Sequence, residues 1–203
     1  MNKKVVVLGG GNGMSTLLRG LKQFPIDLTA IVSVCDDGKS TGRLRTEFNQ
    51  VAVGDIRRVL IAMSETEPLF EELLNYRFKT TSDLNGHAVG NLLLTAMANI
   101  TGNMSDGIES LSKVLNLKGK VLPLTEDNVD LIGVTKEGYE IIGEEQITQA
   151  KREIVELKYN KKVSVYPKVI EEVKKANLII FSSGSLLTSV LPHAIVPELQ
   201  EAI

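Results

Sequence analysis

The sequence predicts an α/β protein in which helices cover an open, mostly parallel sheet. Val5–Leu8 is an uninterrupted aliphatic run without polar alternation, which is typical of a parallel strand buried on both faces. The glycine-rich segment Gly9–Gly13 ends this strand, and leucines at helical spacing follow between residues 17 and 21. A second buried run, Ala30–Val34, completes a strand–turn–helix–strand unit, with which an open α/β sheet begins.

Helices are predicted over most of the next segment. Apolar residues at helical spacing indicate four helices, which begin near Asp55, Pro68, Leu92 and Ser105. We expect the Asp55 carboxylate to cap the first of these helices, and Pro68 suits the first turn of the second. In that second helix four apolar residues are expected to face inward: Leu69, Phe70, Leu73 and Leu74.

Short strands become the predicted element after Gly119. They lie at residues 120–122, 131–134, 139–142 and 154–159, and Lys136–Gly138 is a typical hairpin turn. The α/β pattern then returns with a helix that begins at Pro167 and a buried strand, Asn177–Phe181. A further helix is predicted near Ser185. We therefore divide the chain into residues 1–118, a β-rich insertion or lobe at 119–160, and a return to the α/β core at 161–203.

Composition narrows the class of partner and the compartment. The chain has 203 residues and a formal net charge of −2, so it can bury a sizeable core but has no basic footprint for nucleic acid. Its single cysteine, Cys35, has no partner for an internal disulfide, which fits a reducing compartment. No apolar run approaches the roughly 20 residues of a membrane helix. We expect a cytoplasmic protein without nucleic-acid partners and without a membrane span.

The turn after the first strand is the strongest candidate site. It consists of Gly9, Gly10, Gly11, Asn12 and Gly13. Such a turn lets the backbone approach a ligand closely, and the free N–H groups of the following helix favour a phosphate. The strict dinucleotide pattern G-x-G-x-x-G is not met, because Met14 or Thr16 stands where its last glycine is required. The alternative interpretation is a turn that only lets the strand and the helix pack.

Two acidic residues follow the second strand. Asp36 and Asp37 lie about 20 residues beyond the glycine turn, where dinucleotide-binding folds place an acid on a ribose hydroxyl. Paired carboxylates also suit Mg²⁺ beside a bound phosphate, and solvated loop acids are the third interpretation. Lys39 and Ser40 follow in a sequence that is similar to a P-loop, but Ser33 stands where that motif needs its first glycine. Lys39 is still expected in a polar turn near the ligand.

Arginines supply further candidates for contacts to phosphate. Arg43 and Arg45 carry forked guanidinium groups that suit a bidentate grip on phosphate, although a lone arginine is usually a surface charge. Arg57 follows Asp55 at the start of a predicted helix, where exposed arginines behind an N-cap are the simpler interpretation.

A histidine and a second glycine-containing turn complete the set. His87 lies between two glycines ahead of an apolar helix, so its ring either faces a cleft or bridges loops. A zinc site is not supported, because no second histidine or cysteine lies at ligand spacing. Gly184 and Ser185 follow a strand, and ligands of open α/β sheets bind outside the carboxyl ends of strands. A serine hydrolase is not supported there, because Leu187 replaces the second glycine of its motif. His193 is expected on the surface.

Taken in order, these motifs resemble those of the YvcK-type gluconeogenesis factors (UPF0052) of the CofD-like superfamily. The resemblance covers nearly the whole chain. It rests on five segments: residues 9–21, 36–45, 54–57, 86–92 (which include Asn91) and 184–192. The chain departs from the usual family pattern at Asn12, at Val53 and at Ser182–Ser183. Members of this family usually continue past Ile203, so we expect this chain to lack their last part.

The resemblance implies a Rossmann-like three-layer αβα fold and a nucleotide-binding site in residues 1–118. For the regulator branch it implies binding of UDP-N-acetylglucosamine, control of carbon flow toward cell-wall precursors and cell shape, and no required cofactor. The glycine turn would then hold the pyrophosphate and Asp36 or Asp37 a ribose hydroxyl or Mg²⁺. Phosphate charge would be neutralised by Arg43, Arg45 and Arg57, while His87, Asn91 and Gly184–Ser185 would close the cleft.

Two alternative functions remain open, and so does the identity of the partner proteins. CofD relatives are magnesium-dependent transferases that move phospholactate from a guanosine-nucleotide donor to a deazaflavin precursor, and such a transfer needs mainly positioning and charge neutralisation. A dehydrogenase is the weakest interpretation, because it rests on fold analogy alone. For the regulator we expect a partner enzyme of amino-sugar synthesis, and a homo-oligomer is compatible with the sequence.

Overall fold

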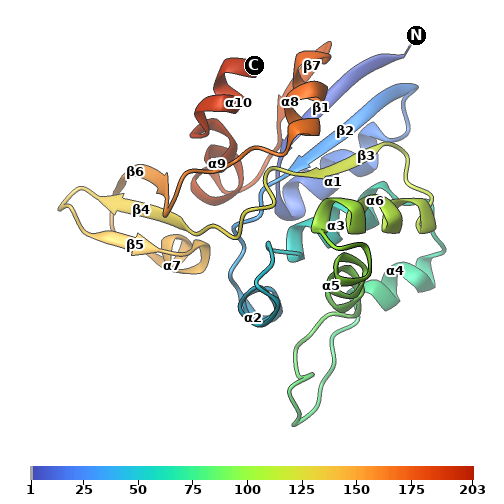
Figure 1. The fold of residues 1–203 in the computed structure, drawn as a ribbon, viewed down its shortest axis with the longest axis horizontal. Helices are drawn as coiled ribbons and strands as arrows, with labels where there is room; N and C mark the ends of the chain where they lie inside the picture. Colours follow the sequence, from blue (N-terminus) through green and yellow to red (C-terminus); the bar gives the residue numbers. More distant parts are fainter. Residues whose placement is uncertain (1) are drawn as a thin grey trace.

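The computed structural model describes residues 2–203 and contains a four-stranded sheet between two layers of helices, with a small separate sheet at one side (Figure 1). The strands are β1 (Lys3–Gly9), β2 (Ile26–Val32), β3 (Lys120–Pro123), β4 (Leu131–Thr135), β5 (Glu140–Ile142), β6 (Ile154–Tyr159) and β7 (Leu178–Phe181). The helices are α1 (Gly11–Leu21), α2 (Lys39–Phe48), α3 (Gly54–Met63), α4 (Pro68–Asn75), α5 (Val89–Thr101), α6 (Met104–Val114), α7 (Glu144–Gln149), α8 (Pro167–Lys174), α9 (Leu191–Ala194) and α10 (Pro197–Ala202), and a π-helical turn, η1, spans Leu186–Val190.

The four strands of the main sheet are parallel, in the order β3-β2-β1-β7. β1 lies at the centre, where Val5 pairs with Leu28 of β2 on one side and with Leu178 of β7 on the other. The chain first builds outward from β1 to β2 and β3, and only then returns to add β7 on the opposite side. The order of strands therefore reverses between β1 and β7.

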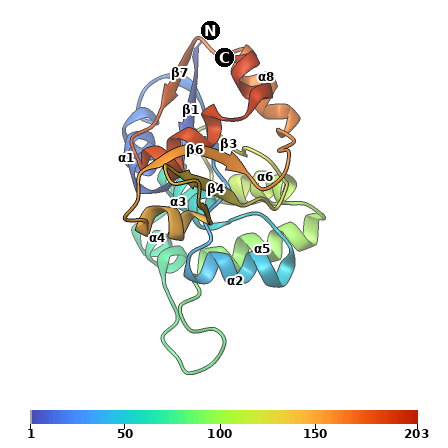
Figure 2. The same cartoon turned by 90° about the vertical axis from the view of Figure 1, so that its left-hand side faces the viewer.

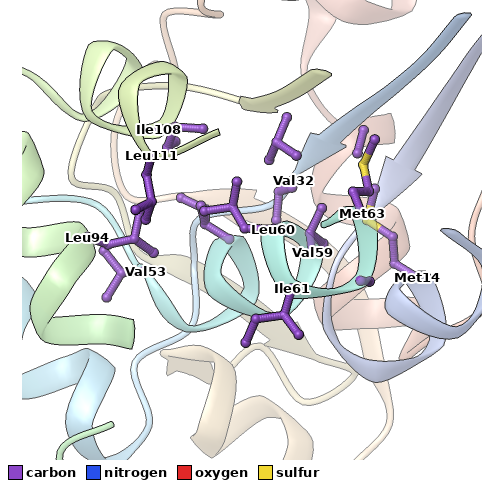
Figure 3. Packing of buried hydrophobic residues seen from close by; sticks show 14 of the residues in the cluster. Met14, Val32, Val53, Val59, Leu60, Ile61, Met63, Leu94, Ile108 and Leu111 are labelled. Carbon is purple, nitrogen blue, oxygen red and sulfur yellow. The ribbon is translucent and has the colours of Figure 1, made fainter. Parts of the chain in front are cut away.

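Side chains of β1 alternate between two hydrophobic cores. Val5 and Val7 face a core formed mainly with α1, α3, α5 and α6, whereas Val6 and Leu8 face a second core formed with α8, α10 and the small sheet. In the first core Leu60 of α3 lies amid side chains from the sheet and the other helices (Figure 3). The predicted α/β class is confirmed, because both faces of a parallel sheet are covered.

The small sheet is antiparallel, in the order β5-β4-β6, and carries the predicted hairpin turn between β4 and β5. We refer to this sheet together with α7 as the lobe. The prediction for residues 120–122 was wrong in one respect, because β3 pairs with β2 in the main sheet and not with the lobe. A strand of four residues carries too little pattern to show which sheet it joins.

Several local predictions are corrected by the structure. Asp55 does not cap α3: the helix begins at Gly54 and its N-cap residue is Val53, so the carboxylate is free to point elsewhere. In α4 only Leu74 of the four expected residues is buried, whereas Leu69 is 77% exposed. His193 is fully buried, not on the surface, and its Nε2 lies 3.1 Å from the carbonyl oxygen of Ile31.

Two further elements differ from the sequence pattern. The polar segment after Asp37 forms α2, which was not predicted as a helix. The strand predicted as buried, β7, is the edge of the described sheet, so Leu178 and Phe181 are largely exposed. Among residues 2–203, no helix combines the length and the apolar character that crossing a membrane would require.

Candidate functional site

The glycine turn lies at the point where the strand order reverses. β1 ends at Gly9 and α1 begins at Gly11, whose φ of +68° is a conformation that glycine adopts without strain. A methyl group on Gly13 would overlap the carbonyl of Ser183, so the turns after β1 and β7 are in direct contact. Ligands of open α/β sheets bind in the crevice outside such a switch point.

Close packing accounts for part of the glycine content. Methyl groups on Gly9 and Gly13 would collide with Ser182 and Ser183, and one on Gly10 would lie 2.5 Å from an Asp55 carboxylate oxygen. The packing role left open as an alternative therefore applies to these positions. The turn is nevertheless not covered, because Asn12 is exposed and its two neighbours are partly exposed.

Carboxyl groups gather beside this turn. Burial raises the pKa of Asp55 to about 6 and the charge of Asp36 adds to the rise, while Arg58, which forms an ion pair with Asp55, and the N–H of Gly11 oppose it. Burial also raises the pKa of Glu144, in the lobe, to about 8, and the charges of Asp55 and Asp36 contribute. The start of α1 thus faces acidic groups.

Asp36 and Asp37 point in different directions. Asp36 Oδ1 accepts a hydrogen bond from the N–H of Gly38 at 3.0 Å, which fixes the entry to α2. Asp37 Oδ1 accepts one from the N–H of Glu145 at 2.9 Å and ties the same loop to the lobe. Within residues 2–203 no group of three or more His, Cys, Asp or Glu side chains is placed to hold a metal ion. Mg²⁺ would need ligand phosphates as well, which is usual for that ion.

A second part of the predicted site lies along α2. A cleft of about 840 Å³ runs there between the segment before β4 and the loop of residues 78–87. This loop projects from the body in both views (Figures 1 and 2). Five predicted residues line the cleft: Asp37, Lys39, Arg43, Arg45 and His87. Lys39 is exposed there and has a φ of +44°, which is uncommon for a residue with a side chain.

Ser40, His87 and Asn91 form one buried hydrogen-bonded group. Ser40 Oγ lies 2.9 Å from His87 Nδ1 and accepts a hydrogen bond from Asn91 Nδ2 at 3.2 Å. Burial lowers the pKa of His87, and the positive charge of Arg43 lowers it further. The sequence named all three residues, and the structure brings Ser40 to the other two although it lies 47 and 51 residues from them in the chain.

The predicted arginines have different surroundings. Arg45 is buried and donates to Asn128 Oδ1 at 2.7 Å, to the Val129 carbonyl at 2.8 Å and to Asp130 Oδ1 at 3.0 Å. Those contacts join α2 to the segment before β4 and leave Arg45 little capacity for a ligand. Arg57 is buried beneath the start of α5. Its side chain packs so closely there that a methyl group added to Gly90 would lie 2.8 Å from the Arg57 Cδ.

The turn after β7 contributes backbone more than side chains. The Ser185 carbonyl accepts the N–H of Ser189 at 2.9 Å, and Gly184 lies near the carbonyl of Gly10. Sequence reasoning missed Glu144, whose position in the lobe carries no motif. It also missed Arg77, whose positive charge contributes to lowering the pKa of both Arg57 and His87.

Comparison with known proteins identifies the family. Residues 5–203 match the family described as 2-phospho-L-lactate transferase CofD. The chain belongs to this CofD family. It is also 48% identical over 208 residues to a protein of Halalkalibacterium halodurans and 45% identical over 201 residues to one of Bacillus subtilis, both named gluconeogenesis factor. These matches cover 99% and 98% of this chain, and the chain spans about 63% of the length of both relatives.

A solved structure shows the same fold for a CofD-family relative. A crystal structure of a Bacillus halodurans protein matches with a TM-score of 0.97 and 47% sequence identity, covering all of this chain and 66% of the other. A second crystal structure of a Bacillus halodurans protein, described as a member of the UPF0052 family, matches with a TM-score of 0.97 and 46% identity. The expected membership in the gluconeogenesis-factor group of the CofD family is thereby confirmed.

Proposed function

We propose that this chain is the nucleotide-sugar-binding part of a gluconeogenesis factor. It would bind UDP-N-acetylglucosamine and regulate carbon flow toward cell-wall precursors and cell shape, without catalysing a reaction itself. The observation that carries the proposal is the cleft along α2, which is lined by the basic side chains of Lys39 and Arg43 and by His87. The relatives' name, gluconeogenesis factor, supports the regulatory role.

The cleft along α2 supports a ligand of this size. Its volume of about 840 Å³ falls within the roughly 300–1,000 Å³ of small-molecule sites. It is walled by three separate parts of the molecule, represented by Lys39 of α2, Asp83 of the 78–87 loop and Asn128 ahead of the lobe. A ligand that bridges these parts would fix their relative positions. We propose that a partner enzyme of amino-sugar synthesis, or a second copy of the chain, responds to that change.

The test is thermal unfolding in the presence of UDP-N-acetylglucosamine, UDP or N-acetylglucosamine alone. A ligand that binds only the native state stabilises it by about 2.7 kcal/mol at 100 times its Kd, so the melting temperature should rise with the nucleotide sugar. Lys39→Gln, which removes an exposed charge from the cleft, should reduce the rise. Lys79→Gln, an exposed lysine on the projecting loop that does not line the cleft, is the matched control. No shift at millimolar nucleotide sugar would reject the proposal.

A transferase of the CofD type is the second candidate. The family description favours it, and so do the neighbouring carboxyl groups of Asp36 and Asp55 near the glycine turn. Mg²⁺ held there with ligand phosphates would neutralise charge that develops during phosphoryl transfer. The decisive measurement is release of GMP from a guanosine-activated phospholactate with a deazaflavin acceptor. Tight binding without turnover would leave the regulator as the function.

A further inference from the structure

Three arginines around the root of the 78–87 loop have no acidic partner. Within residues 2–203, Arg43, Arg57 and Arg77 form no ion pair, whereas Arg45 and Arg58 each contact a carboxylate. The three donate only to backbone carbonyls: Arg43 to Asp83 at 3.0 Å and to Asn85, Arg57 to Leu74 at 3.4 Å, and Arg77 to Gly86 at 2.7 Å. Carbonyl dipoles orient a guanidinium group but do not neutralise its charge.

Arg57 is the most buried of the three arginines. The residue is 5% exposed, and its Nε is buried without a hydrogen-bond partner. Burial lowers its pKa, the charges of Arg58 and Arg77 add to the fall, and the charges of Asp55 and Asp36 oppose it; the resulting pKa of about 10 keeps the group protonated at neutral pH. A buried charge without a partner is strongly unfavourable. The simplest compensation is an anion bound from outside the chain.

Neighbouring polar atoms are oriented to receive the same anion. Ser40 Oγ already accepts from Asn91 Nδ2, so its own proton is available for His87 Nδ1 at 2.9 Å. His87 is then neutral with its proton on Nε2, in agreement with its lowered pKa. Since His87 lines the cleft, Nε2–H is the hydrogen-bond donor that it presents there. Of the three arginines, Arg43 also lines this cleft.

The glycine turn is poorly suited to the same charge. A carboxylate oxygen of Asp55 lies against Gly10, and Asp36 adds negative charge nearby. A phosphate placed there would meet repulsion that the N–H groups of α1 must first overcome. At the loop root, by contrast, three guanidinium groups form no ion pair, although the adjoining cleft is also lined by Asp37, Glu47, Asp83 and Asp130.

We propose that the root of the 78–87 loop is the phosphoryl-anion site, in which Arg43, Arg57, Arg77 and the Nε2–H of His87 hold a diphosphate. That this diphosphate belongs to a nucleotide sugar rests on the proposed function; the anion site itself does not. The ribose and the sugar would extend along α2 toward Lys39. Arg77 becomes a binding residue that sequence motifs did not indicate.

Inorganic pyrophosphate is the probe, in calorimetric titrations of the chain in low-salt buffer without other phosphate. We expect one site, with binding weakened at least tenfold by Arg77→Gln and within a fewfold of wild type for Arg77→Lys, which keeps the charge. Arg152→Gln removes one exposed charge from the lobe, where Arg152 pairs with Glu137, and should bind within twofold of wild type. No binding by the wild type, or equal binding by R77Q and R152Q, would overturn the site.

Arg57→Met separates a binding role from a structural one. Without anion we expect the variant to melt at the wild-type temperature or above, because a buried charge is replaced by an apolar chain of similar size. It should also lose the stabilisation that pyrophosphate gives the wild type. A lower melting temperature with unchanged pyrophosphate affinity would make Arg57 structural and contradict its place in the site.

The two proposals fail in different ways. Pyrophosphate binding that depends on Arg77, without any response to UDP-N-acetylglucosamine, supports the anion site and rejects the nucleotide sugar. A response to UDP-N-acetylglucosamine that R77Q and R57M leave unchanged supports the proposed function and overturns the anion site.

Discussion

The glycine turn and the root of the 78–87 loop were both expected to contact phosphate, yet different charged side chains lie next to each of them. At the turn, backbone N–H groups lie beside Asp55, whose carboxylate contacts Gly10. At the loop root, Arg57 and Arg77 form no ion pair in the described part of the chain, although Asp55 and Asp36 also raise the pKa of Arg57. A glycine-rich turn before a helix therefore shows where the backbone can approach closely, whereas the sign of the neighbouring side chains decides what binds.

The largest expected effect concerns the acidic side of this comparison. The folded-state pKa of Asp55 is about 6, above its ordinary 3.8, so the folded protein holds this proton more tightly than the unfolded chain. The resulting stabilisation is present below about pH 4 and is lost as the pH rises through 6. The difference between these two pKa values corresponds to roughly 3 kcal/mol.

Asp55→Asn should therefore flatten the fall in unfolding free energy between pH 4 and pH 7, measured by urea denaturation at several pH values. Asp27→Asn, at an exposed position on β2, should retain the wild-type slope. If D55N shows the same slope as wild type, the carboxyl group is not held in a proton-retaining environment. The contrast between the two regions would then disappear.

A smaller effect tests the close packing of the glycine turn. Gly13→Ala places a methyl group on the backbone of Ser183 and should destabilise the fold by about 1–3 kcal/mol, as overpacking does. Gly20→Ala is the control in the same helix, because nothing lies within 4 Å of its added methyl group. That change should stabilise by roughly 0.5–1 kcal/mol. Denaturant midpoints measure both, and equal values would contradict the contact between the turns after β1 and β7.

Sequence patterns predicted the fold better than the surroundings of the site. Val5–Leu8 identifies a buried strand because every side chain is apolar, and both faces of β1 are indeed covered. By contrast, α2 has little apolar pattern; its helix depends on tertiary contacts such as those of Arg45 with the segment before β4. Periodicity cannot report such contacts.

The residues of the site were named more reliably than their partners. Ser40, His87 and Asn91 were each singled out, but the hydrogen bonds among them join positions about 50 residues apart. Likewise, a glycine–aspartate step marked Asp55 as an N-cap, and only the folded chain shows its carboxylate turned toward Gly10 instead. Motifs give residue types and order along the chain; the direction of a side chain depends on packing between distant segments.

The smallest expected effect concerns the hydrogen-bonded group at the loop root. Ser40→Ala removes the hydroxyl that His87 and Asn91 share, and should cost about 1–2 kcal/mol because two buried polar groups lose a partner. Thr46→Ala is the control on the same helix, since that exposed hydroxyl only donates to the Gly42 carbonyl of its own helix. Without the hydroxyl that donates to Nδ1, the neutral form of His87 loses a stabilising hydrogen bond, so the pKa of His87 should rise. NMR titration of the imidazole protons can follow this change. An unchanged His87 titration in S40A would mean that Ser40 does not set the tautomer, and that the proton on Nε2 is not fixed for an incoming anion.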